Sequence, residues 1–287
     1  MVLLPRGQRR GTMEIIDSHQ HFWDHNLRDY SHIAGNSFYL NNFYPKDLKP
    51  LMSETGVEGT ILVQAHPSKE EADWLISIAE DNPFVLGVVA WLNLASKNFK
   101  KDLESLEVSK KFKGVRSMLT LEDDDFWVLR EDVANGFELL EKKGLTYDFL
   151  VEPRHLPAIP KIASAYPKAK FVIDHIAKPL IAAGQREPWG TLMKSIAKNE
   201  NVYVKISGLV SEDDPENIQV AHSKPFVDEI IRLFGFSRVM YGSDWPVSAA
   251  VLPYEQVLKY ILECLGQISE GQMSAFLYGN AKEFYNA

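Results

Sequence analysis

The sequence predicts an α/β protein folded as one (β/α)8 barrel. Eight short apolar segments rich in β-branched residues alternate with segments of helical periodicity. The strand-like segments are apolar on both faces, which is typical of parallel strands covered by helices. Eight such units, at about 30 residues each, account for nearly all of the 287 residues.

The eight predicted strands share a compact apolar run bounded by polar or turn-forming residues. They cover residues 14–21, 59–66, 85–94, 112–119, 145–152, 169–176, 201–209 and 238–246. Helical patterns lie between or after them, and several end at Gly, Asn or Pro, as helices commonly do. These patterns cover residues 44–56, 69–82, 134–144, 156–167, 224–235, 254–265 and 269–285.

Residues 1–12 are expected to be a disordered extension, and residues 13–287 a single catalytic barrel domain. The alternative is an open, doubly wound sheet with an appended domain. Against it, no predicted strand is followed by a glycine-rich phosphate loop, and no linker-like change of composition interrupts the chain.

Composition excludes several functional classes. The chain is 45% hydrophobic and 24% charged, as in soluble globular proteins, and its net charge of −8 comes without a long basic run. We therefore expect no nucleic-acid partner. No apolar stretch reaches the 18 or so residues that cross a bilayer, so no membrane association is expected. The single cysteine, Cys264, fits a reducing compartment and predicts a cytoplasmic protein, either monomeric or homo-oligomeric.

Metal-ligating residue types collect at the predicted strand ends, where barrel enzymes place their active sites. Asp17, His19 and His21 alternate at the end of the first strand, so they are expected on one face. His175 ends the sixth strand, and Asp244 ends the eighth. His19, His21, His175 and Asp244 form a candidate nitrogen and oxygen ligand set for one divalent cation, with zinc favoured. A site without metal, in which the imidazoles donate hydrogen bonds, is the alternative.

Five other residues are candidates for substrate binding. Arg116 ends the fourth strand and can offer two parallel hydrogen bonds to a carboxylate or to neighbouring hydroxyls. His66 and Asn93 end the second and third strands, and Trp23 and Trp245 could form the floor of a sugar site. Each also has a structural alternative, namely a rim ion pair, a loop cap or core packing.

Lys205 lies within the seventh predicted strand, with Asp17 or Asp174 as its candidate partner. A buried lysine needs such a partner because an isolated buried charge is costly. We interpret this pairing as structural.

Several of these residues fall in motifs that resemble amidohydrolase family 2, and within it the branch of sugar-lactone and 2-pyrone-4,6-dicarboxylate lactonases. The motifs run in the family's order from about residue 13 to the end of the chain. They include DSHQHFWD at 17–24, YDFLVEPRHLP at 147–157, FVIDHIAKP at 171–179 and YGSDWPV at 241–247.

The resemblance implies a (β/α)8 hydrolase that opens a cyclic ester. His19, His21, His175 and Asp244 match the family's site positions, where the aspartate activates water, so Asp244 and His175 are the expected catalytic residues. Members of this branch are described both with one divalent metal and with none. The fifth strand lacks the histidine of binuclear relatives, which argues against a two-metal centre.

The leading hypothesis is thus a lactonase for a small sugar-acid or carboxylated lactone. Where sugar-lactonase relatives often have Arg-His after the fourth strand, this chain has Arg116 followed by Ser117, so the exact lactone is left open. A metal-dependent decarboxylase of small aromatic acids is the second reading. A catalytically silent binding barrel is the third.

Overall fold

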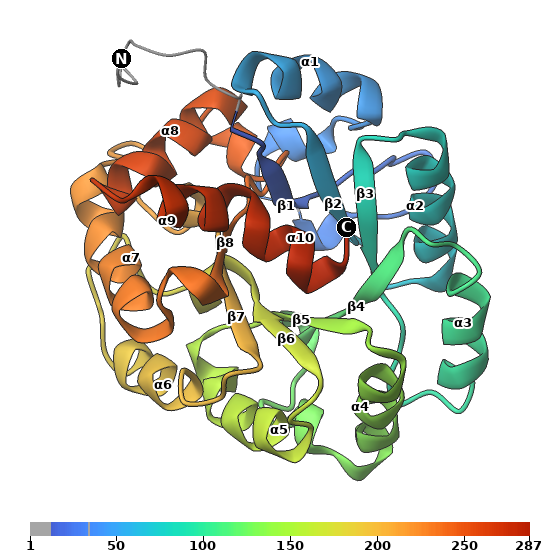
Figure 1. The fold of residues 1–287 in the computed structure, drawn as a ribbon. Coiled ribbons are helices and arrows are strands. Elements are labelled where there is room, and N and C mark those ends of the chain that lie inside the picture. Colours follow the sequence, from blue (N-terminus) through green and yellow to red (C-terminus); the bar gives the residue numbers. More distant parts are fainter. Residues whose placement is uncertain (1–12, 34) are drawn as a thin grey trace.

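The computed structural model describes residues 13–33 and 35–287, and the predicted extension at residues 1–12 lies outside them. Eight parallel strands follow one another in sequence order around a single sheet, which confirms the predicted (β/α)8 barrel (Figure 1). Each lies within one of the predicted ranges. The strands are β1 (Ile16–Gln20), β2 (Gly59–Val63), β3 (Val85–Ala90), β4 (Phe112–Met118), β5 (Thr146–Leu150), β6 (Lys170–Ile173), β7 (Val202–Ile206) and β8 (Val239–Tyr241).

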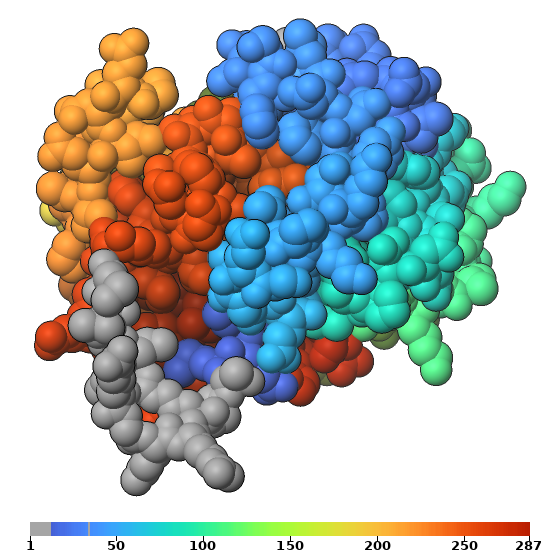
Figure 2. Space-filling view, turned by 90° about the horizontal axis from the view of Figure 1, so that it is seen from above, coloured from blue at the N-terminus to red at the C-terminus, as the bar shows by residue number. Residues whose placement is uncertain are grey.

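The barrel closes where β8 meets β1. The His21 N–H donates to the Trp245 carbonyl at 2.7 Å, and the Asp244 N–H donates to the His19 carbonyl at 2.8 Å. Both bonds lie at or just beyond the strand ends, so closure joins two segments that carry candidate site residues. Figure 2 shows the outer side of this seam, where the blue N-terminal units lie against the orange C-terminal helices.

Helices surround the strands and cover their outer faces (Figure 1). Two short helices, α3 and α6, were not among the predicted helical patterns, and the final predicted helix is divided by a π-helical segment at Ala275–Gly279. The helices are α1 (Pro45–Thr55), α2 (Lys69–Asp81), α3 (Phe99–Leu106), α4 (Glu131–Lys143), α5 (Ile159–Ala165), α6 (Trp189–Ile196), α7 (Val220–Phe234), α8 (Tyr254–Leu265), α9 (Glu270–Ser274) and α10 (Asn280–Tyr285).

The core has two layers. Most buried apolar side chains lie between the strands and the surrounding helices, whereas a smaller cluster fills the barrel interior. That inner cluster includes Ile61, Val89 and Met240 from the strands, together with Phe284 and Tyr285 from α10. In Figure 1, α10 lies across the opening of the barrel. Burial of these side chains closes one end of the barrel and leaves the carboxyl ends of the strands for the polar residues.

No helix in the described part of the chain is long and apolar enough to cross a membrane.

Candidate active site

Four candidate residues from three strand ends meet at the carboxyl end of the barrel. His19 Nε2 lies 3.1 Å from His21 Nε2. One carboxylate oxygen of Asp244 lies 3.4 Å from His21 Nε2, 3.7 Å from His175 Nε2 and 3.8 Å from His19 Nε2. All four side chains are buried. The structure therefore brings together the four residues proposed as a ligand set, which lie far apart in the sequence.

An irregularity in β1 aims its two histidines. The register with β2 shifts between Asp17 and Gln20, as at a β-bulge, which redirects the side chains that follow. The spacing had predicted that Asp17 would share one face with the two histidines, and this prediction was wrong. The Asp17 carboxylate accepts hydrogen bonds from the Ser243 N–H at 2.8 Å and from the Tyr254 hydroxyl of α8 at 3.0 Å. Burial raises the pKa of Asp17 to about 6, although these bonds oppose the shift.

The sixth strand stops at Ile173, and the next residues form a left-handed turn. His175, Ile176, Ala177 and Lys178 all have positive φ angles, between 47° and 65°. Each such residue other than glycine costs roughly 1–2 kcal/mol, and a β-branched residue such as Ile176 is rarely found there. Trp189 holds the turn by donating its indole N–H to the Ile176 carbonyl at 2.7 Å. Strain of this kind persists where surrounding packing enforces it, and it is common at functional sites.

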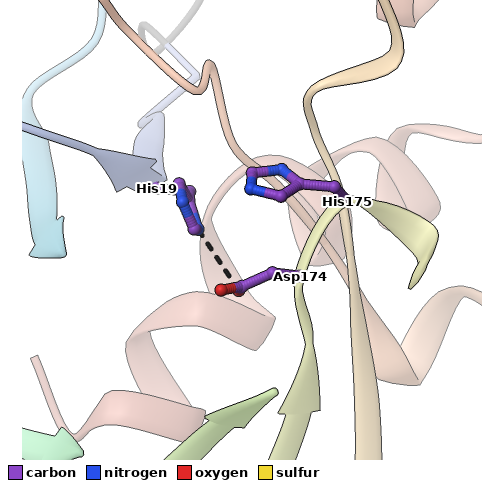
Figure 3. Close-up of side chains that lie close together, drawn as sticks. All are labelled: His19, Asp174 and His175. Atoms are coloured by element: carbon purple, nitrogen blue, oxygen red, sulfur yellow. Dashed lines mark ion pairs between the residues drawn. The ribbon is translucent and has the colours of Figure 1, made fainter. Parts of the chain in front are cut away.

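This turn places two side chains beside His19 (Figure 3). Asp174 Oδ1 lies 3.2 Å from His19 Nδ1, and the imidazole of His175 packs edge-on against that of His19 at 4.4 Å between ring centres. His175 Nδ1 is 2.9 Å from the Ser207 hydroxyl, which follows β7. Burial lowers the pKa of both His19 and His175 well below the ordinary value, so both rings are neutral near pH 7.

Asp244 is ionised in this environment. Burial alone would raise its pKa, but the neighbouring side chains of His175, His21 and Lys178 lower it below the usual 3.8. Its φ of 58° is left-handed, a conformation that Asp tolerates better than most residues. The structure thus offers a buried, charged carboxylate among three imidazoles, which is an arrangement suited to binding a cation or accepting a proton from water.

The ring nitrogens of His21 have distinct roles. Nδ1 lies 2.8 Å from the Val63 carbonyl, an acceptor, so Nδ1 carries the proton and Nε2 presents a lone pair. That lone pair points toward His19 Nε2, 3.1 Å away. Two nitrogens at this separation can both bind one zinc ion at about 2.0–2.1 Å. The donor set His19, His21 and Asp244 therefore fits a divalent cation, as does the set His19, Asp174 and His175.

A buried layer of charges lies on the inner side of His19. Lys205 Nζ contacts His19 Nδ1 at 3.1 Å, Asp174 Oδ1 at 3.0 Å and Asp148 Oδ2 at 2.6 Å. Of the two partners predicted for Lys205, the structure selects Asp174. Asp148 also accepts the Tyr285 hydroxyl of α10 at 2.7 Å. Burial would raise the pKa of Asp174, but Lys205 and His19 hold it well below the ordinary value.

Asp148 and Tyr285 were not predicted as site residues. The signal for Asp148 is a carboxylate in the middle of an otherwise apolar strand, which needs a buried partner. Nothing in the local pattern around Tyr285 indicates that its hydroxyl enters the barrel.

Arg116 and Asn93 already bond to the protein. Arg116 Nη1 lies 3.1 Å from Asp174 Oδ2, and its other terminal nitrogen donates to the Gln64 carbonyl. The exposed Asn93 accepts the Ala95 N–H at 3.0 Å in a loop cap. Among the described residues, Arg116 Nε and the side-chain amide of Gln64 are buried without a hydrogen-bond partner. Unpaired buried groups of this kind can bond to a bound ligand.

His66 lies on the loop after β2, held by a buried carboxylate. Glu71 Oε2 accepts the N–H groups of His66 at 2.7 Å and of Ala65 at 3.0 Å, while Oε1 accepts the Tyr30 hydroxyl at 2.9 Å. Burial raises the pKa of Glu71 to about 7. The His66 ring is only partly buried and packs beside His32 and Tyr30. Glu71 thereby ties the loops after β1 and β2 together.

The two candidate tryptophans are packed with other aromatic side chains. Trp23 is fully buried against Phe43, and its indole N–H donates to the Asn41 carbonyl at 2.9 Å. Trp245 is 4% exposed and packs edge-on against Phe43 and Phe22. In the structure, both rings line the outer core beside the site.

A (β/α)8 barrel with imidazoles and an ionised aspartate converging at its carboxyl end defines a barrel hydrolase. The model of the Amidohydrolase family matches residues 16–287, and the chain belongs to this family. The resemblance found in its sequence motifs is thus confirmed.

Similar proteins support this assignment. An L-fucono-1,5-lactonase of Burkholderia ambifaria is 37% identical over 275 residues, covering 94% of each chain. An L-fucono-1,5-lactonase of Burkholderia multivorans is 30% identical and covers 94% of this chain and 95% of that one. A crystal structure of an amidohydrolase from Burkholderia multivorans with bound zinc has a TM-score of 0.90 and 30% identity, covering 95% of this chain and 99% of that chain.

Proposed function

We propose that this protein hydrolyses the lactone of a sugar acid to the open-chain acid, with L-fucono-1,5-lactone as the favoured substrate. One observation carries the proposal. Asp244 lies within 3.4–3.8 Å of three imidazole nitrogens in a chain that is 37% identical to an L-fucono-1,5-lactonase. Lactone hydrolysis needs a water made nucleophilic, a polarised carbonyl and a proton for the departing alkoxide.

Asp244 is the general base in this proposal. Its carboxylate is ionised, because its pKa is lowered, and it takes a proton from water as the water oxygen attacks the lactone carbonyl. The tetrahedral intermediate then expels the ring oxygen, which receives that proton from Asp244. The carbonyl carbon gains the water oxygen and loses the ring oxygen, so the product is the hydroxy acid.

His19, His21 and Asp244 would hold one divalent cation, with His175 beside it and zinc as the favoured ion. A cation there supplies Lewis acidity to the lactone carbonyl. Several contacts orient the ligands: the Val63 carbonyl fixes the tautomer of His21, and Asp174 and Lys205 hold His19 Nδ1.

Arg116 and His66 are proposed to bind the substrate. Arg116 is anchored to Asp174 and retains an unpartnered Nε, and the partly buried His66 lies on the loop after β2. Either group can donate to a lactone hydroxyl or carbonyl oxygen.

The test is acid release by purified protein, with and without added zinc, from L-fucono-1,5-lactone, L-rhamnono-γ-lactone and 2-pyrone-4,6-dicarboxylate. Uncatalysed hydrolysis is subtracted with a protein-free blank. Catalysed acid release from a sugar lactone is expected. Release of carbon dioxide from dihydroxybenzoates, without lactone hydrolysis, would replace this function with the decarboxylase reading.

A further inference from the structure

The left-handed turn after β6 carries a second polar group besides His175. Lys178 is the last residue of the turn, and its N–H donates to the His175 carbonyl at 2.9 Å. The two residues are therefore held together by one short backbone bridge. Any change in the turn would move both side chains at once.

Lys178 is paired with a residue of the neighbouring loop. Its Nζ lies 2.5 Å from Glu212 Oε1, and Glu212 follows β7. The two loops also share a backbone hydrogen bond, from the Ala182 N–H to the Glu212 carbonyl at 3.1 Å. The pair thus joins the loop after β6 to the loop after β7, beside the strand ends that hold the site.

The loop that carries Glu212 passes close to the cluster. A Cβ placed on Gly208 would lie 2.7 Å from His175 Nδ1 and 3.2 Å from Asp244 Oδ2, and Gly208 has a left-handed φ of 61°. Only glycine allows this approach without displacing the catalytic side chains. Glu212 lies four residues further along the same short loop.

Lys178 is held in its charged form by Glu212 and acts electrostatically on Asp244. Burial lowers the pKa of Lys178, but the Glu212 carboxylate more than offsets this and the pKa is raised, with a further contribution from Asp244. Lys178 in turn contributes to the lowered pKa of Asp244.

The pair remains accessible to solvent. The side chains of Lys178 and Glu212 are 29% and 21% exposed, whereas His175 and Asp244 are nearly buried. Lys178 has free N–H donors beyond the one given to Glu212, and Glu212 has a second carboxylate oxygen. Together they offer both a donor and an acceptor. A sugar hydroxyl, which donates and accepts at the same oxygen, matches this combination.

We propose that Lys178 and Glu212 form a specificity-determining pair that binds a ring hydroxyl of a polyhydroxylated lactone. This inference rests on the proposed lactonase function. The pair positions the ring, whereas Asp244 acts on the reacting carbonyl. The contact is made to both ground state and transition state, so its loss raises KM more than it lowers kcat.

The test compares Lys178→Met and Glu212→Gln with the wild type on two six-membered lactones, L-fucono-1,5-lactone and the unhydroxylated δ-valerolactone. For the hydroxylated lactone, Lys178→Met is expected to raise KM at least about tenfold while kcat stays within about threefold, because a charged hydrogen bond is lost. On δ-valerolactone, which has no ring hydroxyl for the pair to bind, Lys178→Met is expected to change KM far less than on L-fucono-1,5-lactone, and Lys178→Arg should recover part of the KM.

Lys143 and Glu107 provide a matched control. This pair has a similar separation, 2.6 Å, and similar exposure, 26% and 27%, but joins the ends of two outer helices. Lys143→Met should leave both kinetic constants unchanged.

Three results would overturn the inference. They are a fall in kcat with KM unchanged, an equal loss on both lactones, or the same KM change in Lys143→Met. If the wild type hydrolyses no lactone at all, the proposed function itself fails. If the wild type is active and Lys178→Met is equally active, only this inference fails.

Discussion

His21 Nε2 and His19 Nε2 lie 3.1 Å apart, and the bond from His21 Nδ1 to the Val63 carbonyl leaves a lone pair on the His21 nitrogen that faces His19. Two facing ring nitrogens at this separation are bridged either by a proton or by a cation. The pair therefore has the arrangement that a chelate for a cation requires, and its geometry depends on a backbone carbonyl of the neighbouring strand.

Zinc binding should accordingly depend on His21. After incubation with zinc and dialysis, the wild type should retain about one zinc ion per chain by elemental analysis, whereas His21→Ala should retain little, because one of three ligands is lost. His222→Ala is the control, since His222 pairs with Asp213 outside this cluster. Absence of zinc from the dialysed wild type would contradict a metal role.

Asp244→Asn should abolish most turnover while preserving the fold. Asn tolerates the left-handed conformation of this residue but cannot accept a proton from water. The expected loss of kcat is about 10²- to 10⁴-fold, the usual contribution of a general base. Circular dichroism and the melting temperature should match those of the wild type. Full activity in a folded Asp244→Asn protein would reject the assignment.

The contributions of Lys205 and Asp148 to the free energy of unfolding should be coupled, because the two buried charges neutralise one another. Lys205→Met removes the cation that Asp148 and Asp174 share, and such a loss costs about 3–5 kcal/mol of unfolding free energy. Adding Asp148→Asn removes one uncompensated charge, so the double variant should be more stable than Lys205→Met alone. Urea denaturation measures both. Simple addition of two destabilising effects would show that the pair is not coupled.

Glu71 should make stability depend on pH. Its pKa is raised from 4.5 to about 7 in the folded protein, so the folded state binds the proton more tightly than the unfolded state. This contribution is fully present below about pH 4.5 and is lost as the pH rises through about 7. The free energy of unfolding should therefore fall by up to about 3 kcal/mol over this range.

Glu71→Gln isolates that contribution. Gln can still accept the N–H groups of Ala65 and His66, but it does not titrate. Between pH 5 and pH 8 the unfolding free energy of this variant should change less than that of the wild type. Identical pH profiles for the two proteins would exclude Glu71 as the source.

Much of this arrangement was predictable from the sequence, because it follows from periodicity and strand order. Eight apolar runs predicted eight strands, and the barrel topology then required the residues after β1, β6 and β8 to meet. The position of Asp17 was not predictable, since a shift in register changes which face a side chain occupies without leaving a clear mark on the pattern. The four left-handed residues after β6 were likewise not predictable, because Ile176 and Ala177 are residue types that rarely adopt this conformation.

The contact between Tyr285 and Asp148 has a consequence for how the chain folds. Asp148, Lys205 and Tyr285 come from segments separated by 57 to 137 positions, yet their polar groups complete one another inside the barrel. A partial barrel that held Asp148 without Lys205 and α10 would enclose an uncompensated carboxylate, which is costly. Such a fragment should therefore gain little free energy by becoming compact before the rest of the barrel forms. The buried charges therefore favour cooperative assembly of the whole barrel over a stable half-barrel intermediate.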